Sequence, residues 1–184
     1  MTTFKTHYKE KITPELTKSL GITNKMAVPK IQKVVVNVGV GKTLKDQKLL
    51  EAIIEDLRKI TGQQPVKTLS KKSIAGFKIR EGQVVGVVVT LRGQRMYDFL
   101  EKLVRVALPR VRDFKGISAK SFDGQGNYSL GLREQIVFPE TAREHIEHTF
   151  GLEVNIQTTA RDNKHAEALL RSMGFPLQQE ENKK

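Results

Sequence analysis

The sequence predicts an α+β fold of two layers, in which helices cover one face of a largely antiparallel sheet and the other face stays open. Three segments, 31–41, 84–92 and 152–158, alternate apolar and polar residues, which is the pattern of a strand with one buried face. Segments with a helical apolar stripe separate these strands. Because each strand keeps one polar face, we expect the helices on a single side of the sheet. The length of 184 residues predicts a single domain, 1–184.

The N-terminal part of the chain is predicted to be a helix followed by a strand. Apolar residues recur every four positions within about 5–20, and Gly21 is placed to end this helix. From Ile31 the apolar period changes to two, and the alternate valines share one face. The opposite face of this strand carries Lys33, Val35, Asn37, Gly39 and Gly41.

A second helix is expected after this strand. Thr43 and Asp46 match the spacing of a capping box, and an apolar stripe continues to Ile60, after which Gly62 ends the helix. Weaker strand signals lie at 66–70 and 128–133.

Two more helices are predicted in the second half of the chain. The stretch "RMYDFLEKLVRVAL" places its apolar residues on one helical face, and Pro109 is expected to end that helix. The last helix is predicted from about Asp162 to Met173, with Thr159 as its capping residue. The polar tail, about 178–184, is expected to fray.

The segment "VVVNVGVGKT", 34–43, looks at first like a phosphate-binding loop, but two glycine motifs each fail by one residue. A Walker loop needs a glycine where this chain has Val36, and the dinucleotide fingerprint needs one at Leu44. Without those glycines the backbone amides cannot curl around a phosphate. The segment is better interpreted as the end of a strand and the start of a helix.

Composition narrows the classes of function. A formal net charge of +12 and a pI of about 9.9 are typical of proteins that bind polyanions, although a merely basic protein has the same balance. The absence of cysteine excludes a disulfide framework and a cysteine-ligated metal. No apolar stretch has the length of a membrane span, and the first residues lack a signal-peptide core. We expect a soluble cytoplasmic protein without a cofactor.

The open face of the sheet is the first candidate binding surface. Gly39, Gly41 and Gly86 carry no side chain there, so a partner could approach the backbone closely. The alternative is that these glycines form bulges that relieve the twist of the sheet. Hydrogen-bonding and charged side chains are expected around them at Lys33, Asn37, Thr90 and Arg92.

A basic segment, about 70–82, is the second candidate surface. Five positive charges between Lys67 and Arg80 precede the first acidic residue, Glu81. The small residues of this segment bury little, so it is interpreted as a protruding hairpin loop that suits phosphate groups, with Phe77 available to stack or insert. The alternative is a solvated basic loop. The candidate residues are Lys71, Lys72, Ser73, Gly76, Phe77, Lys78 and Arg80.

Three other groups of residues give weaker indications of function. A second basic group surrounds the turn "ALPRVRDFKG" and consists of Lys102, Arg105, Arg110, Arg112 and Lys115, where Asp113 can pair with an arginine. His145 and His148 have the wrong spacing for a zinc protease, so we expect two exposed histidines and no metal. "FDGQGNY", 122–128, offers too few oxygens for calcium and suits a turn.

Several segments in a fixed order resemble a known family. "PKIQKVVVNVGVG", "KKSIAGFKIREG", "RMYDFLEKLVRVALPRVRDFKG", "FDGQGNYSLGLREQIVFPE" and "LLRSMGFP" are closely similar to the bacterial large-subunit ribosomal protein of family five, which binds 5S rRNA. The resemblance covers about residues 5–177. It departs locally at "TAREHIEHT" and at Leu177, where the family commonly has an aromatic residue.

This resemblance implies a protein without enzymatic activity that holds 5S rRNA in the central protuberance and helps attach it to the large-subunit rRNA. Family binding residues carry over to Asn37, Gln63, Thr90 and Arg92, so the expected 5S rRNA site consists of these together with Lys33, Gly39, Gly41 and Gly86. The basic loop resembles the family's projection toward the elbow of P-site tRNA. The family also contacts a protein of the small-subunit head in an intersubunit bridge. Neither a membrane nor a small-molecule substrate is implied.

Two other classes of function remain open at this point. A basic NTPase or RNA-modifying enzyme would use the segment from Gly39 to Thr43, and it would bind ATP or GTP. A DNA-architectural protein would depend on charge alone, and it would show little preference between RNA and DNA.

Overall fold

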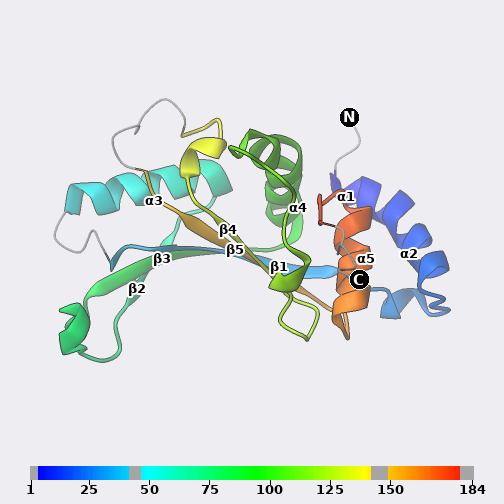
Figure 1. The fold of residues 1–184 in the computed structure, drawn as a ribbon, viewed down its shortest axis with the longest axis horizontal. Coiled ribbons are helices and arrows are strands. Elements are labelled where there is room, and N and C mark those ends of the chain that lie inside the picture. The colour runs from blue at the N-terminus through cyan, green and yellow to red at the C-terminus, as the bar shows by residue number, and fades with distance from the viewer. Residues whose placement is uncertain (1–3, 42–46, 142–148, 179–184) are drawn as a thin grey trace, which may run out of the picture. The chain divides into compact units, whose positions relative to one another are not determined.

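A computed structural model of the protein describes residues 4–41, 47–141 and 149–178. Its elements form the predicted α+β class, with a five-stranded antiparallel sheet in the order β2–β3–β1–β5–β4 (Figure 1). The strands are β1 (Ile31–Gly39), β2 (Val66–Leu69), β3 (Val84–Leu91), β4 (Tyr128–Leu132) and β5 (Leu152–Thr158). All the strands predicted from the sequence are therefore confirmed.

Contacts between residues divide the chain into two compact units. The first comprises Met1–Val34, Arg92–Leu130 and Asn155–Lys184, and the second comprises Val35–Leu91 and Gly131–Val154. The strands β1, β4 and β5 contribute residues to both units. The single domain expected from chain length stays a prediction.

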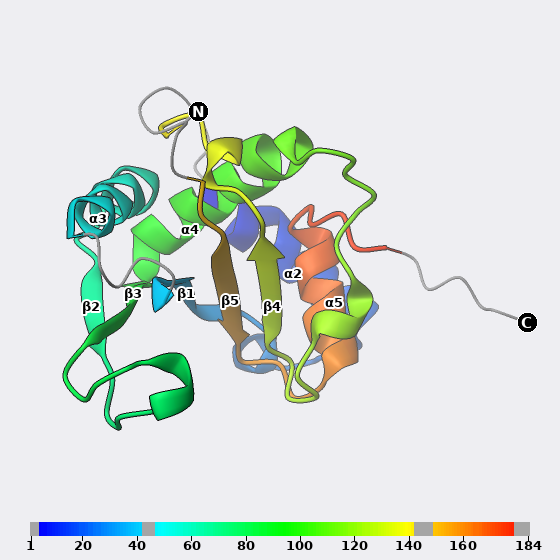
Figure 2. The ribbon, with the colours of Figure 1, turned by 60° about the vertical axis from the view of Figure 1, so that its left-hand side comes forward.

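The first unit is mostly helical. Its N-terminal segment runs as α1 (Phe4–His7), a π-helical turn (Tyr8–Ile12) and α2 (Thr13–Ser19). Helix α4 (Gly93–Lys102) contacts α1, and α5 (Asn163–Ser172) lies beside α2 (Figure 2). The apolar faces of these helices are buried, as their spacing predicts. Fully buried members are Ile12, Leu16, Phe99, Leu100, Leu103, Leu169 and Leu170.

Two helix boundaries differ from the prediction. The last helix is capped by Asp162, whose side chain accepts a hydrogen bond from the His165 amide at 2.9 Å, whereas the Thr159 hydroxyl accepts one from the Lys30 amide at 3.0 Å. Thr159 is therefore not the cap, because its hydroxyl already serves the strand-end contact. The helix expected to end at Pro109 continues from α4 through a π-helical turn and a 3₁₀ turn to Arg110. A proline in the first turn lacks only an N–H that would have no partner there.

The second unit packs helix α3 (Gln47–Thr61) against β3. Val36 and Val38 of β1, and Val40 directly after this strand, are at most 2% exposed. Ile53, Leu57 and Ile60 of α3 are buried as well. The predicted capping box of Thr43 and Asp46 lies outside the described residues. Figure 1 shows α3 along one side of β1 and β3, with the loop between β2 and β3 extending from their ends.

Tyr8 connects three segments of the first unit. Its ring centroid lies 5.7 Å from that of Tyr97 in α4, and its hydroxyl donates a hydrogen bond to the Pro29 carbonyl oxygen at 3.0 Å. Burial raises the pKa of Tyr8 to about 12, and the neighbouring Tyr97 adds to this rise. Tyr8 therefore stays neutral in the folded protein at pH values where an unfolded chain would ionise it.

We expect Tyr8→Phe to lower the free energy of unfolding at neutral pH by about 1 kcal/mol, because the Pro29 carbonyl oxygen loses its donor. A raised folded-state pKa means that the unfolded chain binds fewer protons above about pH 10, so stability falls as pH rises toward about 12. The variant lacks this titration, and its stability should fall less steeply over that range. Urea denaturation of both proteins at neutral and alkaline pH measures the difference. Parallel pH profiles would contradict the assignment.

Candidate nucleic-acid interface

The open face of the second unit lies opposite α3 and is formed by β1, β3 and β2. Asn37 of β1 and Thr90 of β3 are half-buried, while the valines on the opposite side of these strands are almost fully buried at positions 36, 38, 87 and 89. Within the described part of this unit, no helix covers the face (Figure 1). The predicted division of β1 and β3 into an apolar and a polar face is therefore correct.

Gly86 of β3 is buried on this face. A Cβ atom added at Gly86 would lie 2.7 Å from Oγ1 of Thr68, 3.2 Å from the Val38 carbonyl oxygen and 3.7 Å from Oδ1 of Asn37. Thr68 is also the direct antiparallel partner of Gly86 in the β2–β3 pair. The missing side chain therefore makes room for two polar side chains of the protein itself, from the strands on either side of β3.

Gly39 and Gly41 differ from Gly86. Both are exposed, and an added Cβ would have no atom within 4 Å at either position. Their backbone is thus open to a partner, as close approach requires. The bulge alternative applies next to Gly86 instead: Thr68 pairs with Gly86 but Leu69 pairs with Val84, so β3 has one extra residue there.

Gln63 follows the end of α3 and reaches β3. Its side-chain Nε2 donates a hydrogen bond to the Thr90 carbonyl oxygen at 3.1 Å. The hydroxyl of Thr61 fixes the intervening turn, since it lies 2.7 Å from the Leu57 carbonyl oxygen and 3.2 Å from that of Gln63. This bond uses one of the two N–H groups of Nε2, and the Gln63 side chain also carries Oε1 as a hydrogen-bond acceptor.

Lys33 and Arg92 belong to the first unit. Lys33 is half-buried in β1, and Arg92 is exposed immediately before α4. The structure thus brings Asn37, Thr68 and Gly86 together and joins Gln63 to Thr90, all within the second unit.

The basic loop, residues 70–82, is an ordered hairpin. Ser70 and Gln83 are joined by a backbone hydrogen bond at 2.8 Å, and Ile74 and Ile79 by two, at 2.9 and 3.2 Å. A 3₁₀ turn (Ala75–Phe77) forms the tip, followed by Lys78 in the left-handed conformation with φ of 56°. The hairpin therefore holds its tip without burying it.

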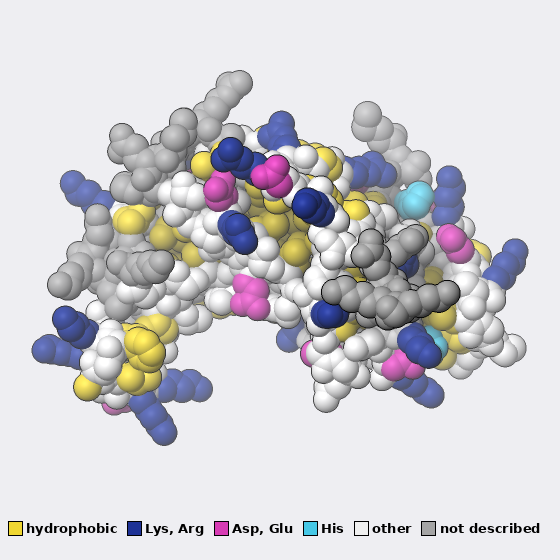
Figure 3. All heavy atoms as spheres, viewed as in Figure 1, with side chains coloured by type: hydrophobic (Ala, Val, Ile, Leu, Met, Phe, Trp, Pro, Cys, Tyr) yellow, Lys and Arg dark blue, Asp and Glu magenta, His cyan; other side chains and the backbone are white. Residues whose placement is uncertain are grey.

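The side chains of this loop point outward. Lys71, Lys72, Lys78 and Arg80 are exposed, and among the described residues none of the four forms an ion pair. Phe77 is 73% exposed and Ile74 46%. Figure 3 shows Lys and Arg side chains spreading around an apolar patch at this end of the second unit. The loop presents unneutralised charge and an aromatic ring together.

The second basic group is only partly available. Arg105 pairs with Glu101 at 2.6 Å and also lies over the Phe4 ring, with Cζ 5.9 Å from its centroid. Arg110, Arg112 and Lys115 are exposed. Asp113 is exposed with φ of 52°, and no described arginine forms an ion pair with it.

The two remaining candidate sites are the segment 122–128, which forms a turn, and the histidine pair, which lies outside the described residues. Asp123 accepts hydrogen bonds from the amides of Gln125 and Asn127 and from the Asn127 side chain, which lower the pKa of its carboxyl group. The "FDGQGNY" segment is therefore a turn, as predicted, and the Asn163 side chain also accepts hydrogen bonds from its Gly124 and Gly126 amides, at 3.1 and 3.3 Å. His145 and His148 lie outside the described residues. Within the ranges that are described, no group of three or more His, Asp or Glu side chains could hold a metal ion, and no helix is long and apolar enough to cross a membrane.

Comparison with known proteins identifies the family. Residues 24–80 match the model described as ribosomal protein L5, and residues 84–177 match the model of the C-terminus of the same ribosomal family. The chain belongs to the ribosomal protein L5 family. It is 54% identical over 173 residues to the large ribosomal subunit protein uL5 of Synechococcus sp. (strain RCC307), which covers 94% of this chain and 97% of that protein. The uL5 proteins of Anaeromyxobacter sp. (strain Fw109-5) and Halothermothrix orenii are 52% and 53% identical over 172 residues, 94% of this chain and 96% of each relative.

Membership in the L5 family settles the class of function. The chain is a protein of the large ribosomal subunit, part of the ribosome in the cytoplasm, and the family is structural and not enzymatic. The NTPase alternative is thereby excluded, as is a DNA-architectural protein.

One residue of the open face, Thr68, was not predicted from the sequence. Thr68 lies on a strand of only four residues, which is too short to establish an alternation. Its place beside Gly86 follows from strand register, which local sequence does not specify.

We expect Gly86→Ala to lower the free energy of unfolding by about 1 to 3 kcal/mol, because its Cβ would overlap Oγ1 of Thr68. Gly39→Ala, the matched control, should change it by less than about 1 kcal/mol, since nothing lies within 4 Å. In a Thr68→Ala background the clash is removed, and the cost of Gly86→Ala should fall by at least about half. Urea denaturation of all five proteins tests this. Equal costs for the two glycine substitutions would show that packing does not require glycine at 86.

Proposed function

We propose that the open face of the second unit binds 5S rRNA. The observation that carries this proposal is the juxtaposition of Asn37 and Thr68 around Gly86, on a helix-free face of a large-subunit ribosomal protein. Short polar side chains and bare backbone can donate to and accept from the sugars and phosphates of a folded RNA. The strands β1, β2 and β3 carry no aromatic residue, so stacking of splayed bases has no support here.

Further residues are proposed to contact 5S rRNA. Gly39 and Gly41 let the RNA backbone approach the end of β1. The side-chain Oε1 of Gln63 can accept a hydrogen bond from a ribose hydroxyl. Lys33, Arg92 and Thr90 belong to the proposed site by resemblance to the family. The positive groups among them contribute attraction to phosphate, which positions the RNA without selecting a sequence.

The basic loop is proposed to contact the elbow of P-site tRNA. Support comes from four exposed cations without described acidic partners and from Phe77 at the tip of an ordered hairpin. Because the hairpin is already ordered, little conformational entropy is lost when it binds. A loop that was merely solvated would have no need of an exposed aromatic residue at its tip.

Two further contacts complete the proposal. The protein helps attach 5S rRNA to the large-subunit rRNA in the central protuberance, for which the exposed Arg110, Arg112 and Lys115 offer a second phosphate-binding surface. It also takes part in an intersubunit bridge with a protein of the small-subunit head. This last contact is supported by the family resemblance alone.

Asn37→Ala and Thr90→Ala are each expected to weaken 5S rRNA binding by about 1 to 3 kcal/mol, because a hydrogen-bonding group of the RNA loses its partner in a buried interface. Gln125→Ala, at an exposed turn position of the first unit, is the matched control and should leave affinity unchanged. Filter binding with isolated 5S rRNA gives the affinities, and thermal melting verifies the fold. Normal affinity in both variants would remove the open face from the 5S rRNA site.

Neutralising the basic loop separates its role from that of the open face. With Lys71, Lys72, Lys78 and Arg80 replaced by Gln, we expect the slope of log affinity for 5S rRNA against log salt to change by less than about 1. Four lost 5S rRNA phosphate contacts would instead reduce that slope by about 3. Lys33→Gln, at a proposed 5S rRNA contact, is the positive control and should reduce it by about 0.7 to 0.9.

Ribosomes that carry the loop variant should assemble with 5S rRNA but release P-site tRNA faster than ribosomes with the unaltered chain. A slope that collapses in the isolated complex would assign the loop to the 5S rRNA site. Unchanged tRNA release would remove the loop from tRNA contact.

A further inference from the structure

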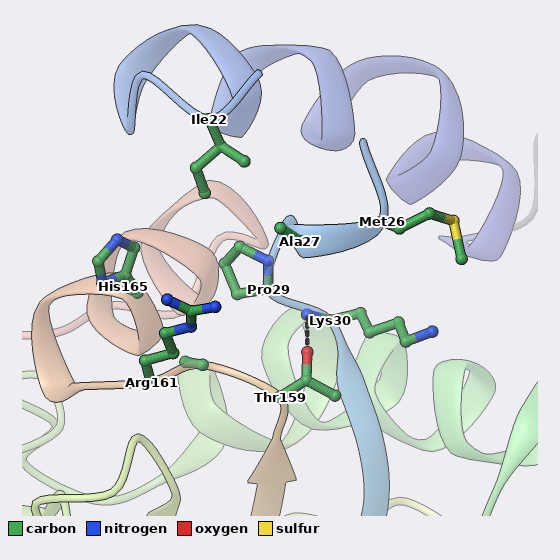
Figure 4. Close-up of a pocket in the computed structure, with 9 residues that line it drawn as sticks. Ile22, Met26, Ala27, Pro29, Lys30, Thr159, Arg161 and His165 are labelled. Atoms are coloured by element: carbon green, nitrogen blue, oxygen red, sulfur yellow. Dashed lines mark hydrogen bonds between the residues drawn. The ribbon is translucent and has the colours of Figure 1, made fainter. Parts of the chain in front are cut away.

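A groove of about 450 Å³ lies within the first unit, away from the residues assigned above to RNA. One wall comes from the segment between α2 and β1 and carries Ile22, Met26, Ala27 and Pro29. The other wall comes from the segment after β5 and from α5, and Figure 4 shows Arg161 there with its guanidinium pointing toward Pro29. Apolar surface and positive charge therefore meet in one depression.

The walls of this groove are held in place by hydrogen bonds. The Lys30 amide donates to the Thr159 hydroxyl at 3.0 Å (Figure 4). The Thr159 amide donates to the Lys30 carbonyl oxygen at 2.9 Å. The Tyr8 hydroxyl holds Pro29 by donating a hydrogen bond to its carbonyl oxygen at 3.0 Å. The Asn24 side chain accepts from the Met26 amide at 2.9 Å and caps the short turn that presents Met26. A ligand would thus meet a preformed site.

Met26 is the most exposed large apolar side chain of the described residues, at 82%. Its flexible thioether can adapt to an apolar partner, and its exposure leaves apolar area to be buried on binding. An RNA ligand makes little use of such a group. Among the described residues that line the groove, the only aromatic ring on which an RNA base could stack is the imidazole of His165.

The charge of the groove selects an anionic partner. Lys30 and Arg161 line it, and none of the described residues that line it carries a carboxylate. The nearest acidic residue in the sequence, Asp162, is engaged by the amide and the ring of His165, at 2.9 and 2.6 Å. The two cations are therefore available to carboxylates of a ligand.

We propose that this groove binds an acidic peptide segment of a protein partner. Figure 4 shows Met26 and Ile22 on opposite sides of Pro29, so one apolar side chain of the peptide lies against Met26 and Pro29, and flanking carboxylates contact Arg161 on one side and Lys30 on the other. The site is small for a protein interface, so the affinity of an isolated peptide is in the range of about 0.01 to 1 mM. This proposal does not depend on the 5S rRNA site.

The test uses the full chain and twenty heptapeptides, each with one varied residue between two runs of three glutamates. Fluorescence anisotropy at physiological salt gives the affinities, and ¹H–¹⁵N spectra locate the binding. We expect peptides with a central Leu, Ile or Met to bind at least about fivefold more tightly than the one with Ser. Their binding should shift the amide signals of residues 26–30 and 159–161.

Variants separate the apolar from the electrostatic contact. Met26→Gln should weaken binding of the Leu peptide about fivefold or more and remove its advantage over the Ser peptide. Met26→Leu should keep both the affinity and the advantage. Arg161→Gln should weaken every peptide. Arg171→Gln, whose arginine pairs with Glu167 at 2.6 Å, and Leu69→Gln, another exposed apolar position, are the matched controls and should change nothing.

Three results would overturn the proposal. These are no binding by any peptide up to about 1 mM, affinities that ignore the central residue, or a uridine heptanucleotide that binds the groove more tightly than the Leu peptide. The first would show that the groove binds no acidic peptide, the second would leave only general charge attraction, and the third would make the groove an RNA site. Met26→Gln should keep its 5S rRNA affinity within about twofold, so failure here is distinguishable from failure of the 5S rRNA assignment.

Discussion

Burial of the alternate valines of β1 is the constraint on which the proposed interface depends. Val34, Val36 and Val38 are fully buried, so the residues between them must point to the opposite side of the strand. A slip of one residue would bury Asn37 and expose three valines, at a cost of roughly 1.5 to 3 kcal/mol for each side chain. The position of the polar face is thus fixed by packing on the other side, and not by any interaction of its own.

This constraint explains which parts of the site were predictable. Asn37 and Thr90 follow from strand alternation, because period and burial are properties of a local segment. Thr68 and the contact of Gln63 with Thr90 depend on which strands pair and in which register, and that information is spread over distant parts of the chain. The cap of the last helix was wrong for a similar reason. Thr159 and Asp162 both suit the role locally, and a long-range bond to Lys30 removes Thr159 from it.

The two candidate surfaces of the second unit differ in how they would respond to their surroundings. The polar side chains that the second unit contributes to the open face, Asn37, Thr68 and Thr90, are uncharged, so their hydrogen bonds depend on fit and little on ionic strength. The basic loop carries exposed charge, whose attraction extends about 8 to 10 Å before salt screens it. One surface therefore suits a permanent contact with a folded RNA, and the other suits a contact that must form and break with each partner.

The backbone ladder of the basic loop has a mechanical consequence. The pairs Ser70–Gln83 and Ile74–Ile79 continue the hydrogen bonding of β2 and β3 toward the tip. A hairpin with these hydrogen bonds bends little, because bending it would break backbone hydrogen bonds rather than rotate free torsions. A molecule that grips Phe77 and then moves would pull on the β2–β3 pair itself. The hairpin would thus transmit a force on its tip to the strand pair at its base, where Thr68 faces Gly86.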